Sequence, residues 1–320
     1  MRAIRVQAFG SPEVLQAQDF PTPEPQAGQV RVRVRAAGVN PVEAYIRSGQ
    51  YATLPPLPWT PGLDGAGIID AIGAGVDALA VGDRVYVAGS LTGTYAEFCL
   101  CETHQAHRLP PGLSFSQGAA LGVPYATAFR ALFHRARARK GESVLVHGGS
   151  GGVGVAVIQL ARAAGLRVIA SAGSAAGRQL MRDQGAELVL DHGDDNRWAQ
   201  VAEFTRGHGV DVIVEMRADI NLGHDLTALA RGGRVVIVGS RGSVTINPRE
   251  CMAREAEILG VLLWQMSPAD YRAAHLALGL GLESGTLSPV IARELPLEQA
   301  AEAHRHVLEA SAAGKIVLLP

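Results

Sequence analysis

The segment best suited to chemistry is a glycine loop, Gly149-x-Gly151-x-x-Gly154. The apolar run Ser143–His147 before it predicts a buried strand, and the segment Gly152–Ala164 after it predicts a helix. In this setting the first glycine permits a tight turn, the second lets the backbone approach a pyrophosphate, and the third allows close helix-to-strand packing. The start of the helix also carries the partial positive charge that binds anions. The sequence therefore predicts a dinucleotide-binding loop.

The residues after the second predicted strand bear on which nicotinamide cofactor is bound. An NAD site places an acidic side chain about 20 residues beyond the loop, where it binds the ribose 2′-hydroxyl. Here the segment Ile169–Arg178 contains no carboxylate and offers small polar residues such as Ser174, followed by Arg178. A 2′-phosphate needs room, hydrogen-bond donors and positive charge. The segment predicts NADPH, with the alternative that Arg178 is an ordinary solvated helix residue.

Strands and helices alternate in the part of the chain that carries the loop, after about residue 118. Repeated βα units with continuous apolar strands are typical of a parallel sheet covered on both faces. The predicted elements are strand Ser143–His147, helix Gly152–Ala164, strand Arg167–Ser171, helix Ala175–Gln184, strand Glu187–Asp191, helix 196–206, strand Asp211–Glu215, helix 221–230 and strand Arg234–Gly239. The tail adds helix Pro268–Glu283, a short strand near Val290 and helix Leu297–Leu308.

The first hundred residues show a different pattern, with short strands separated by turns. Gln29–Arg35 alternates apolar and charged residues, as a half-buried strand does. One short helix is expected over Pro41–Ser48, with Asn40 as its N-cap and Glu43 at the third helical position. This part predicts a small β-barrel or a strongly bent sheet, to which a terminal strand over Lys315–Leu319 could return.

Composition limits the functional classes. The 320 residues are 48% hydrophobic and 18% charged, enough for a sizeable core in two domains. Lys plus Arg is 29 against 30 for Asp plus Glu, so no global field attracts nucleic acid or an anionic membrane. Three cysteines cannot form a disulfide framework or a four-cysteine zinc site. Without a signal-peptide core at the N-terminus, we expect a soluble cytoplasmic protein.

Several motifs along the whole chain belong together. They are Ala37–Tyr51, Pro61–Gly67, Val123–Ala128, the glycine loop, His192, Asn221, Val238–Gly242 and Ile246–Arg249. With them the sequence resembles the quinone oxidoreductases of the medium-chain dehydrogenase/reductase superfamily, and among these the zeta-crystallin branch. The resemblance implies an α/β protein with a GroES-like β-barrel domain, residues 1–118 and 265–320, and a Rossmann doubly wound parallel-sheet domain, residues 119–264. It also implies a cofactor between the two domains, and a homodimer or homotetramer formed through the strand around Ile258–Leu263.

The resemblance also assigns cofactor contacts residue by residue. Tyr51 and Thr127 are expected near the nicotinamide, Ser150, Gly151, Gly152 and Val153 at the pyrophosphate, and Gly173, Ser174, Arg178 and His192 at the adenosine end. Asn221, Val238, Gly239, Ser240, Arg241, Val261, Leu262 and Leu263 are expected to complete the site. Two have structural alternatives, since His192 could cap a strand end and Asn221 could be the N-cap of the next helix. One departure is Gly177, where bacterial relatives often carry a Lys that Arg178 would replace.

A metal site is not expected. Zinc alcohol dehydrogenases of the superfamily resemble this chain but need a Cys where Asn40 stands and Gly-His-Glu where Gly62–Asp64 stands, and Leu63 cannot bind a metal. Without a Lewis acid, a substrate already activated toward hydride is favoured, such as a quinone or another activated carbonyl. Asn40, Tyr45 and Tyr51 are the candidate catalytic hydrogen-bond donors to the developing oxyanion.

Two other functions remain open. An enone or enoyl-thioester reductase would use the same cofactor, with Tyr45 as a possible proton donor. A basic run, Phe133–Lys140, and the zeta-crystallin resemblance raise RNA binding or a structural crystallin-like role. The run lacks interleaved aromatic residues and suits a helix C-terminus, so we expect no nucleic-acid partner.

Overall fold

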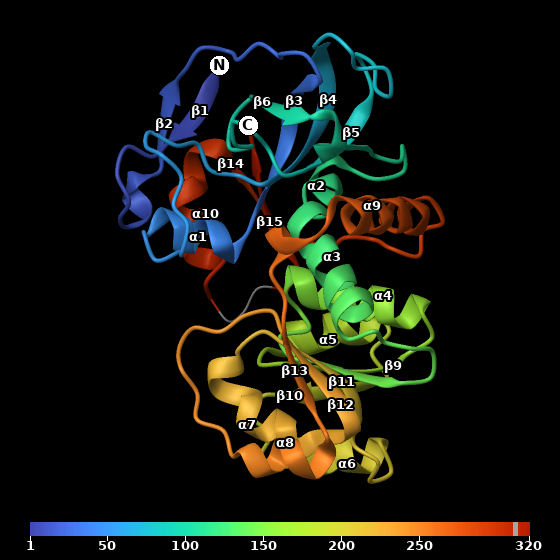
Figure 1. The fold of residues 1–320 in the computed structure, drawn as a ribbon. Helices are drawn as coiled ribbons and strands as arrows, with labels where there is room; N and C mark the ends of the chain where they lie inside the picture. The colour runs from blue at the N-terminus through green and yellow to red at the C-terminus, as the bar shows by residue number, and fades with distance from the viewer. Residues whose placement is uncertain (310–312) are drawn as a thin grey trace. The chain divides into compact units, whose positions relative to one another are not determined.

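The computed structural model describes residues 1–309 and 313–320 (Figure 1). The chain divides into two compact units: unit 1 is Met1–Val123 with Gly279–Pro320, and unit 2 is Pro124–Leu278. The domain boundaries expected from the resemblance are 118/119 and 264/265. No described helix is both long and apolar enough to cross a membrane.

Unit 2 contains a six-stranded sheet in which every neighbouring pair is parallel. Its strands are β8 (Ser143–Val146), β9 (Arg167–Ala172), β10 (Leu188–Asp191), β11 (Val210–Glu215), β12 (Leu229–Ile237) and β13 (Glu257–Gly260). Their spatial order, β10-β9-β8-β11-β12-β13, is the 3-2-1-4-5-6 order of a doubly wound Rossmann sheet. β8 and β9 are buried almost throughout, as expected of a sheet with both faces covered.

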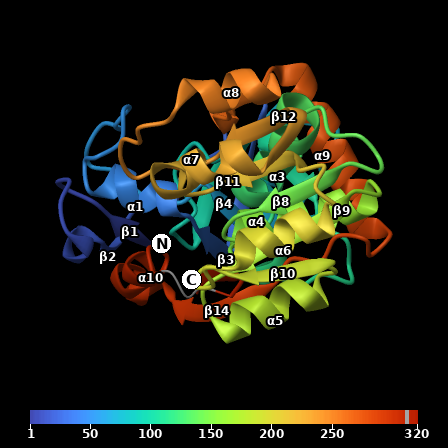
Figure 2. The same ribbon diagram turned by 90° about the horizontal axis from the view of Figure 1, so that it is seen from below.

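Helices connect these strands. They are α4 (Gly152–Ala163), α5 (Ala175–Asp183), α6 (Arg197–Phe204), α7 (Ala218–Ala228) and α8 (Pro248–Arg254). α5 contacts β9 and β10, whereas α8 contacts β12, so the two helices lie toward opposite ends of the sheet (Figure 2). The predicted elements agree within a few residues, with the largest differences at α7, which begins at Ala218 instead of residue 221, and at β12, which begins at Leu229 instead of Arg234.

Unit 1 is built on the bent strand β3 (Gln29–Val39), which pairs with β4, β6 and β15. The other strands are β1 (Arg2–Arg5), β2 (Gln16–Asp19), β4 (Asp64–Ile72), β5 (Arg84–Ala88), β6 (Phe98–Glu102), β7 (Ala106–Arg108), β14 (Ile291–Pro296) and β15 (Lys315–Leu319). Two register shifts between β3 and β4 are the kind of irregularity that bends a sheet. β15 pairs antiparallel with β3, so the expected return of the chain's end is confirmed.

The helices of unit 1 are short. α1 (Pro41–Arg47) and α2 (Phe115–Gly118) lie in the first segment, and α10 (Ala300–His306) lies in the returning segment. The unit boundaries fall within α3 (Gly122–Phe129) and α9 (Pro268–Glu283). α3 continues into a π-helix over Arg130–Arg135. Short 3-10 turns occupy Pro12–Val14, Thr103–Gln105, Leu263–Gln265 and Leu297–Gln299.

Candidate functional site

The glycine loop lies between β8 and α4, beside the point where the strand order reverses. A doubly wound sheet binds its ligand there, beyond the carboxyl ends of the strands. A Cβ atom on Gly149 would lie 2.4 Å from Met181 Sδ, and one on Gly154 would lie 2.4 Å from the Gly148 carbonyl oxygen. A Cβ atom on Gly151 would meet only that oxygen, at 3.6 Å. Gly149 and Gly154 are therefore required by packing, whereas Gly151 leaves space in front of the loop for a ligand.

The start of α4 fits a pyrophosphate. Gly151 is the N-cap of this 12-residue helix, and Gly152 and Val153 form its first turn. Backbone N–H groups in a first turn have no partner within the helix and point along its axis. Ser150, which precedes the cap, is buried. The four residues expected at the pyrophosphate thus form one continuous turn at a helix N-terminus, the kind of position at which anions bind.

A second turn, at the start of α5, approaches the loop closely. The Ser174 hydroxyl caps α5 by accepting from the Gly177 N–H at 3.0 Å. A Cβ atom on Gly177 would lie 2.9 Å from Ser150 Oγ and 3.0 Å from Ser174 Oγ. A larger residue at this position would displace one of these hydroxyl groups. This close approach therefore favours glycine at residue 177.

Arg178 is held by a carboxylate. Its guanidinium lies 2.7 Å from Asp191 Oδ2 and donates to the Gly173 carbonyl oxygen at 3.1 Å. The segment Ile169–Arg178 contains no acidic residue, but the parallel pairing of β9 and β10 brings Asp191 beside its end. Arg178 therefore lies at the expected end of the site with its charge shared with Asp191.

His192 and Asn221 each have a partner inside unit 2. His192 Nε2 lies 2.9 Å from Ser171 Oγ at the end of β9. Asn221 donates its side-chain amide to Glu215 Oε1 at 3.3 Å. The N-cap of α7 is Arg217, so the alternative that Asn221 caps this helix is wrong. The three-residue error in the start of the helix explains this mistake.

The remaining expected contacts follow β12 and β13, or lie in α3. The Val238 and Gly239 N–H groups donate to the Glu215 carbonyl oxygen, and the Arg241 N–H donates to Asp219 Oδ1. Val261, Leu262 and Leu263 directly follow β13, and Ser240 bonds to the Gly242 carbonyl oxygen. Thr127 is buried in α3. All the expected cofactor residues except Tyr51 thus belong to unit 2.

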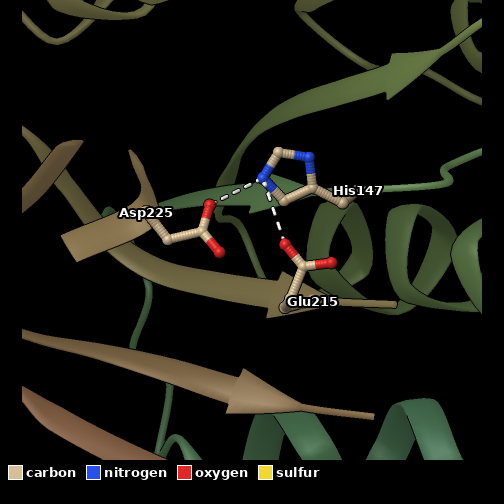
Figure 3. A group of neighbouring side chains, drawn as sticks. All are labelled: His147, Glu215 and Asp225. Carbon is tan, nitrogen blue, oxygen red and sulfur yellow. Dashed lines mark hydrogen bonds and ion pairs between the residues drawn. The ribbon is translucent and has the colours of Figure 1, made fainter. Parts of the chain in front are cut away.

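A buried polar group behind the loop was not expected from the sequence. His147 Nε2 lies 2.8 Å from Asp225 Oδ1 and 3.6 Å from Glu215 Oε2 (Figure 3). Both carboxylates are fully buried, and burial raises the pKa of each to about 7. Burial lowers the pKa of His147. In the sequence, His147 and Glu215 stand at the ends of two strands, and Asp225 stands in a helix. Their spacing along the chain does not predict that they meet.

Unit 1 contains a second buried polar cluster, around Asn40. The Asn40 amide donates to Asp64 Oδ2 at 2.9 Å, and its oxygen accepts from Lys315 Nζ. Lys315 also lies 3.1 Å from Asp64 Oδ2. Glu43 accepts from the Asn40 backbone N–H and from Tyr95 Oη, each at 2.8 Å. Asn40 therefore begins α1 as predicted, but its side chain binds the cluster.

The two candidate tyrosines lie close to α1. Tyr45 is half-buried within α1, and Tyr51 is half-buried shortly after it. Asn40 is 2% exposed, and both the nitrogen and the oxygen of its side-chain amide are hydrogen-bonded. Both tyrosines are therefore more exposed than Asn40.

The positions of a catalytic zinc site do not fit a zinc ion. Leu63 offers no ligand atom, and the Lys315 ammonium already lies 3.1 Å from Asp64 Oδ2. A divalent cation bound to Asp64 would be repelled by this positive charge. Cys99 and Cys101 bring their sulfur atoms within 4.0 Å on β6, but no described His, Asp or Glu completes a group with them. The only described cluster with three possible metal ligands is the His147 group, whose direct 2.8 Å contact has the length of a hydrogen bond.

Arginines of the basic run hold parts of unit 2 together. Arg137 pairs with Glu257 at 2.6 Å, and Arg135 donates to the Gly260 carbonyl oxygen at 2.9 Å. Both partners belong to β13. These contacts support the structural interpretation of the run over an RNA-binding one.

Comparison with known proteins identifies the family. Residues 26–111 match the alcohol dehydrogenase GroES-like domain, and residues 152–278 match the zinc-binding dehydrogenase family. The quinone oxidoreductase of Rattus norvegicus is 51% identical over 100% of this chain and 98% of its own length. The chain belongs to the quinone oxidoreductases of the medium-chain dehydrogenase/reductase superfamily.

Solved structures agree with this membership. The quinone oxidoreductase of Escherichia coli in complex with NADPH has a TM-score of 0.90 at 29% identity and covers 100% of both chains. An NAD-dependent alcohol dehydrogenase has a TM-score of 0.93 at 32% identity, again over 100% of both chains. This quinone oxidoreductase family member therefore consists of a GroES-like and a Rossmann-type unit, and its cofactor is a nicotinamide nucleotide.

Proposed function

We propose that the chain is an NADPH-dependent quinone reductase that needs no metal ion. The observation that carries the proposal is the glycine loop at the strand-order reversal, in a chain 51% identical to a quinone oxidoreductase over its whole length. The Escherichia coli relative binds NADPH with the same fold, which supports this nucleotide over NADH. Ser150, Ser174 and Arg178 support the same choice, since they offer two hydroxyl groups and a cation near one turn.

The protein residues contribute binding and orientation. NADPH, when bound, supplies a hydride from its nicotinamide ring. The first turn of α4 binds the pyrophosphate through backbone N–H groups, and Gly151 keeps that approach open. The adenosine end is held at the start of α5. Binding energy from these remote contacts orients the reacting ring.

The substrate must accept hydride without help from a metal. A quinone does so because the negative charge that develops on its oxygen is delocalised over the ring. A hydroxyl donor near that oxygen stabilises the charge further. Tyr45 and Tyr51 are our candidates for this donor, since both side chains are partly exposed and Asn40 is held in its cluster.

The test is NADPH oxidation by the purified protein, followed by absorbance. We expect 1,2- or 1,4-quinones to be reduced, with weaker turnover from NADH and no effect of a chelator. An enone and an enoyl thioester are offered in parallel. Turnover of these alone would assign double-bond reduction to the same scaffold, and strong inhibition by the chelator would contradict the metal-free mechanism.

Replacing Arg178 with alanine should weaken NADPH binding about tenfold and leave NADH binding unchanged, because only NADPH carries the 2′-phosphate. The effect is moderate because Asp191 already shares the charge. Arg182→Ala, an exposed arginine one turn further along α5, is the matched control. The measurement is a fluorescence titration with each nucleotide. An equal loss for NADPH and NADH would place the 2′-phosphate elsewhere.

We also propose a homodimer or homotetramer and a cytoplasmic location. β13 is an edge strand of the described sheet, and the exposed side chains of Ile258, Leu262 and Trp264 lie on it or just beyond. An edge strand with apolar side chains favours pairing with a second copy. The three free cysteines, two of them buried, suit a reducing compartment.

A further inference from the structure

A chain of hydrogen bonds links the buried carboxylates of unit 2 to its surface. His147 Nε2 lies 2.8 Å from Asp225 Oδ1, and His147 Nδ1 lies 3.2 Å from Ser171 Oγ. Ser171 Oγ in turn lies 2.9 Å from His192 Nε2. Asp225, His147 and Ser171 are buried, whereas His192 is exposed. We call these four residues the relay.

Two buried carboxyl groups, Asp225 and Glu215, lie at the inner end of the relay. Asp225 Oδ2 and Glu215 Oε2 are buried and have no hydrogen-bond partner among the described residues. The pKa of each group is raised by burial to about 7, so the pair retains a proton near neutral pH. The two side chains interact directly, so a proton retained by the pair would lie between them.

The contacts at His147 determine the direction of the hydrogen bonds. Its Nε2 atom faces two carboxyl oxygens, at 2.8 and 3.6 Å (Figure 3). A hydrogen on this nitrogen is attracted by both oxygens, whereas a lone pair would be repelled. His147 Nδ1 is then an acceptor for the Ser171 hydroxyl, and Ser171 Oγ accepts from the Nε2–H of His192.

The outer end of the relay is His192, which lies where the nucleotide is expected to bind. With hydrogen on Nε2, neutral His192 presents the Nδ1 lone pair. A Cβ atom on Gly173 would lie 3.8 Å from this Nδ1 atom, so the nitrogen faces the end of β9. The adenosine ribose of a Rossmann-bound nucleotide lies at the end of that strand.

We propose that His147 and Ser171 are positioning residues that fix His192 as the Nε2–H tautomer, so that its Nδ1 atom meets the adenosine ribose. The proposal rests on the nucleotide binding proposed above. A ribose 2′-hydroxyl can donate to the neutral Nδ1 atom. At a pH above its second pKa, a 2′-phosphate carries no proton and can only accept hydrogen bonds. It therefore requires a proton on His192 Nδ1, which is taken from solvent. NADPH binding therefore takes up a proton at His192, and NADH binding does not.

The charged groups around His192 give the sign of the pH effect. Burial lowers its pKa, the positive charge of Arg197 acts in the same direction, and Asp191, paired with Arg178, opposes them. Free His192 is therefore neutral at pH 7.5. Since bound phosphate raises its pKa, the affinity for NADPH relative to NADH should fall about fivefold between pH 7 and 8.5.

The first measurement is the tautomer of His192 without nucleotide, from imidazole nitrogen shifts of protein labelled with 15N-histidine. His192→Asn identifies its signals. We expect the Nε2–H form in the original protein and a mixture of tautomers in Ser171→Ala. Ser143→Ala is the control, since this buried serine of β8 also bonds a partner, Asp211, through its hydroxyl. An Nδ1–H form, an unchanged tautomer in Ser171→Ala, or a shift of His147 signals on adding Zn²⁺ would overturn the relay.

The second measurement titrates the same samples with NADPH and NADH between pH 7 and 8.5. In Ser171→Ala we expect three- to tenfold weaker NADPH binding at pH 7 and loss of the pH dependence, because the Nδ1–H tautomer becomes available to the phosphate. Nucleotide fluorescence shows whether binding occurs at all. Absence of binding would refute the proposed function, whereas NADPH binding without an effect on His192 would refute only its contact with the ribose.

Discussion

Replacing Lys315 with methionine should destabilise unit 1 by about 3–5 kcal/mol, because it leaves a buried carboxylate without its cation. Asp64 is fully buried, and Lys315 is 4% exposed. The ammonium group bonds the Asn40 oxygen and lies 3.1 Å from Asp64 Oδ2. Loss of this contact also frees the end of β15, where Lys315 stands. The loss is measured as the free energy of unfolding in urea.

The chain offers a matched control, because its only other lysine, Lys140, is exposed. Lys140→Met should change the free energy of unfolding by less than about 0.5 kcal/mol. Combining Lys315→Met with Asp64→Asn should recover at least half of the loss, since the buried negative charge is then removed as well. A loss below about 1 kcal/mol in Lys315→Met would mean that Asp64 does not depend on this ammonium group.

Local sequence patterns were sufficient to predict most strands and helices of the Rossmann-type unit. Short apolar runs alternating with helical segments predicted a parallel sheet covered on both faces, although the order of its strands was not predicted. The start of α1 was also predictable, because Asn40, Pro41 and Glu43 lie within four residues. These features depend on residues that are close together in the sequence. They can therefore be predicted from a single sequence.

The polar clusters were not predictable, because their members are distant in sequence. Asn40 is 24 residues from Asp64 and 275 from Lys315, and His147 is 78 residues from Asp225. Each residue alone had a simple interpretation, such as a helix cap or a strand end. Arg178 shows the same limit, since its partner Asp191 lies on the neighbouring strand. Contacts of this kind depend on strand pairing, which residue spacing does not reveal.

Replacing Gly151 with alanine should weaken NADPH binding about a hundredfold, equivalent to about 2.7 kcal/mol, with no change in melting temperature. The backbone of Gly151 has φ −79° and ψ 172°, which alanine adopts readily, and the added methyl group would meet only the Gly148 carbonyl oxygen at 3.6 Å. The methyl group therefore costs nothing in the free protein. It occupies the space through which the pyrophosphate approaches the backbone.

Gly154→Ala tests the opposite case on the same loop. Its methyl group would lie 2.4 Å from the Gly148 oxygen and 2.6 Å from Gly149 Cα, so the loop and helix must move apart. We expect a lower melting temperature together with weaker binding, whereas Gly151→Ala changes binding alone. Fluorescence titration and thermal unfolding of both variants separate the two roles. Equal melting temperatures in the two variants would contradict the packing role of Gly154, and full NADPH affinity in Gly151→Ala would show that the pyrophosphate does not lie against this turn.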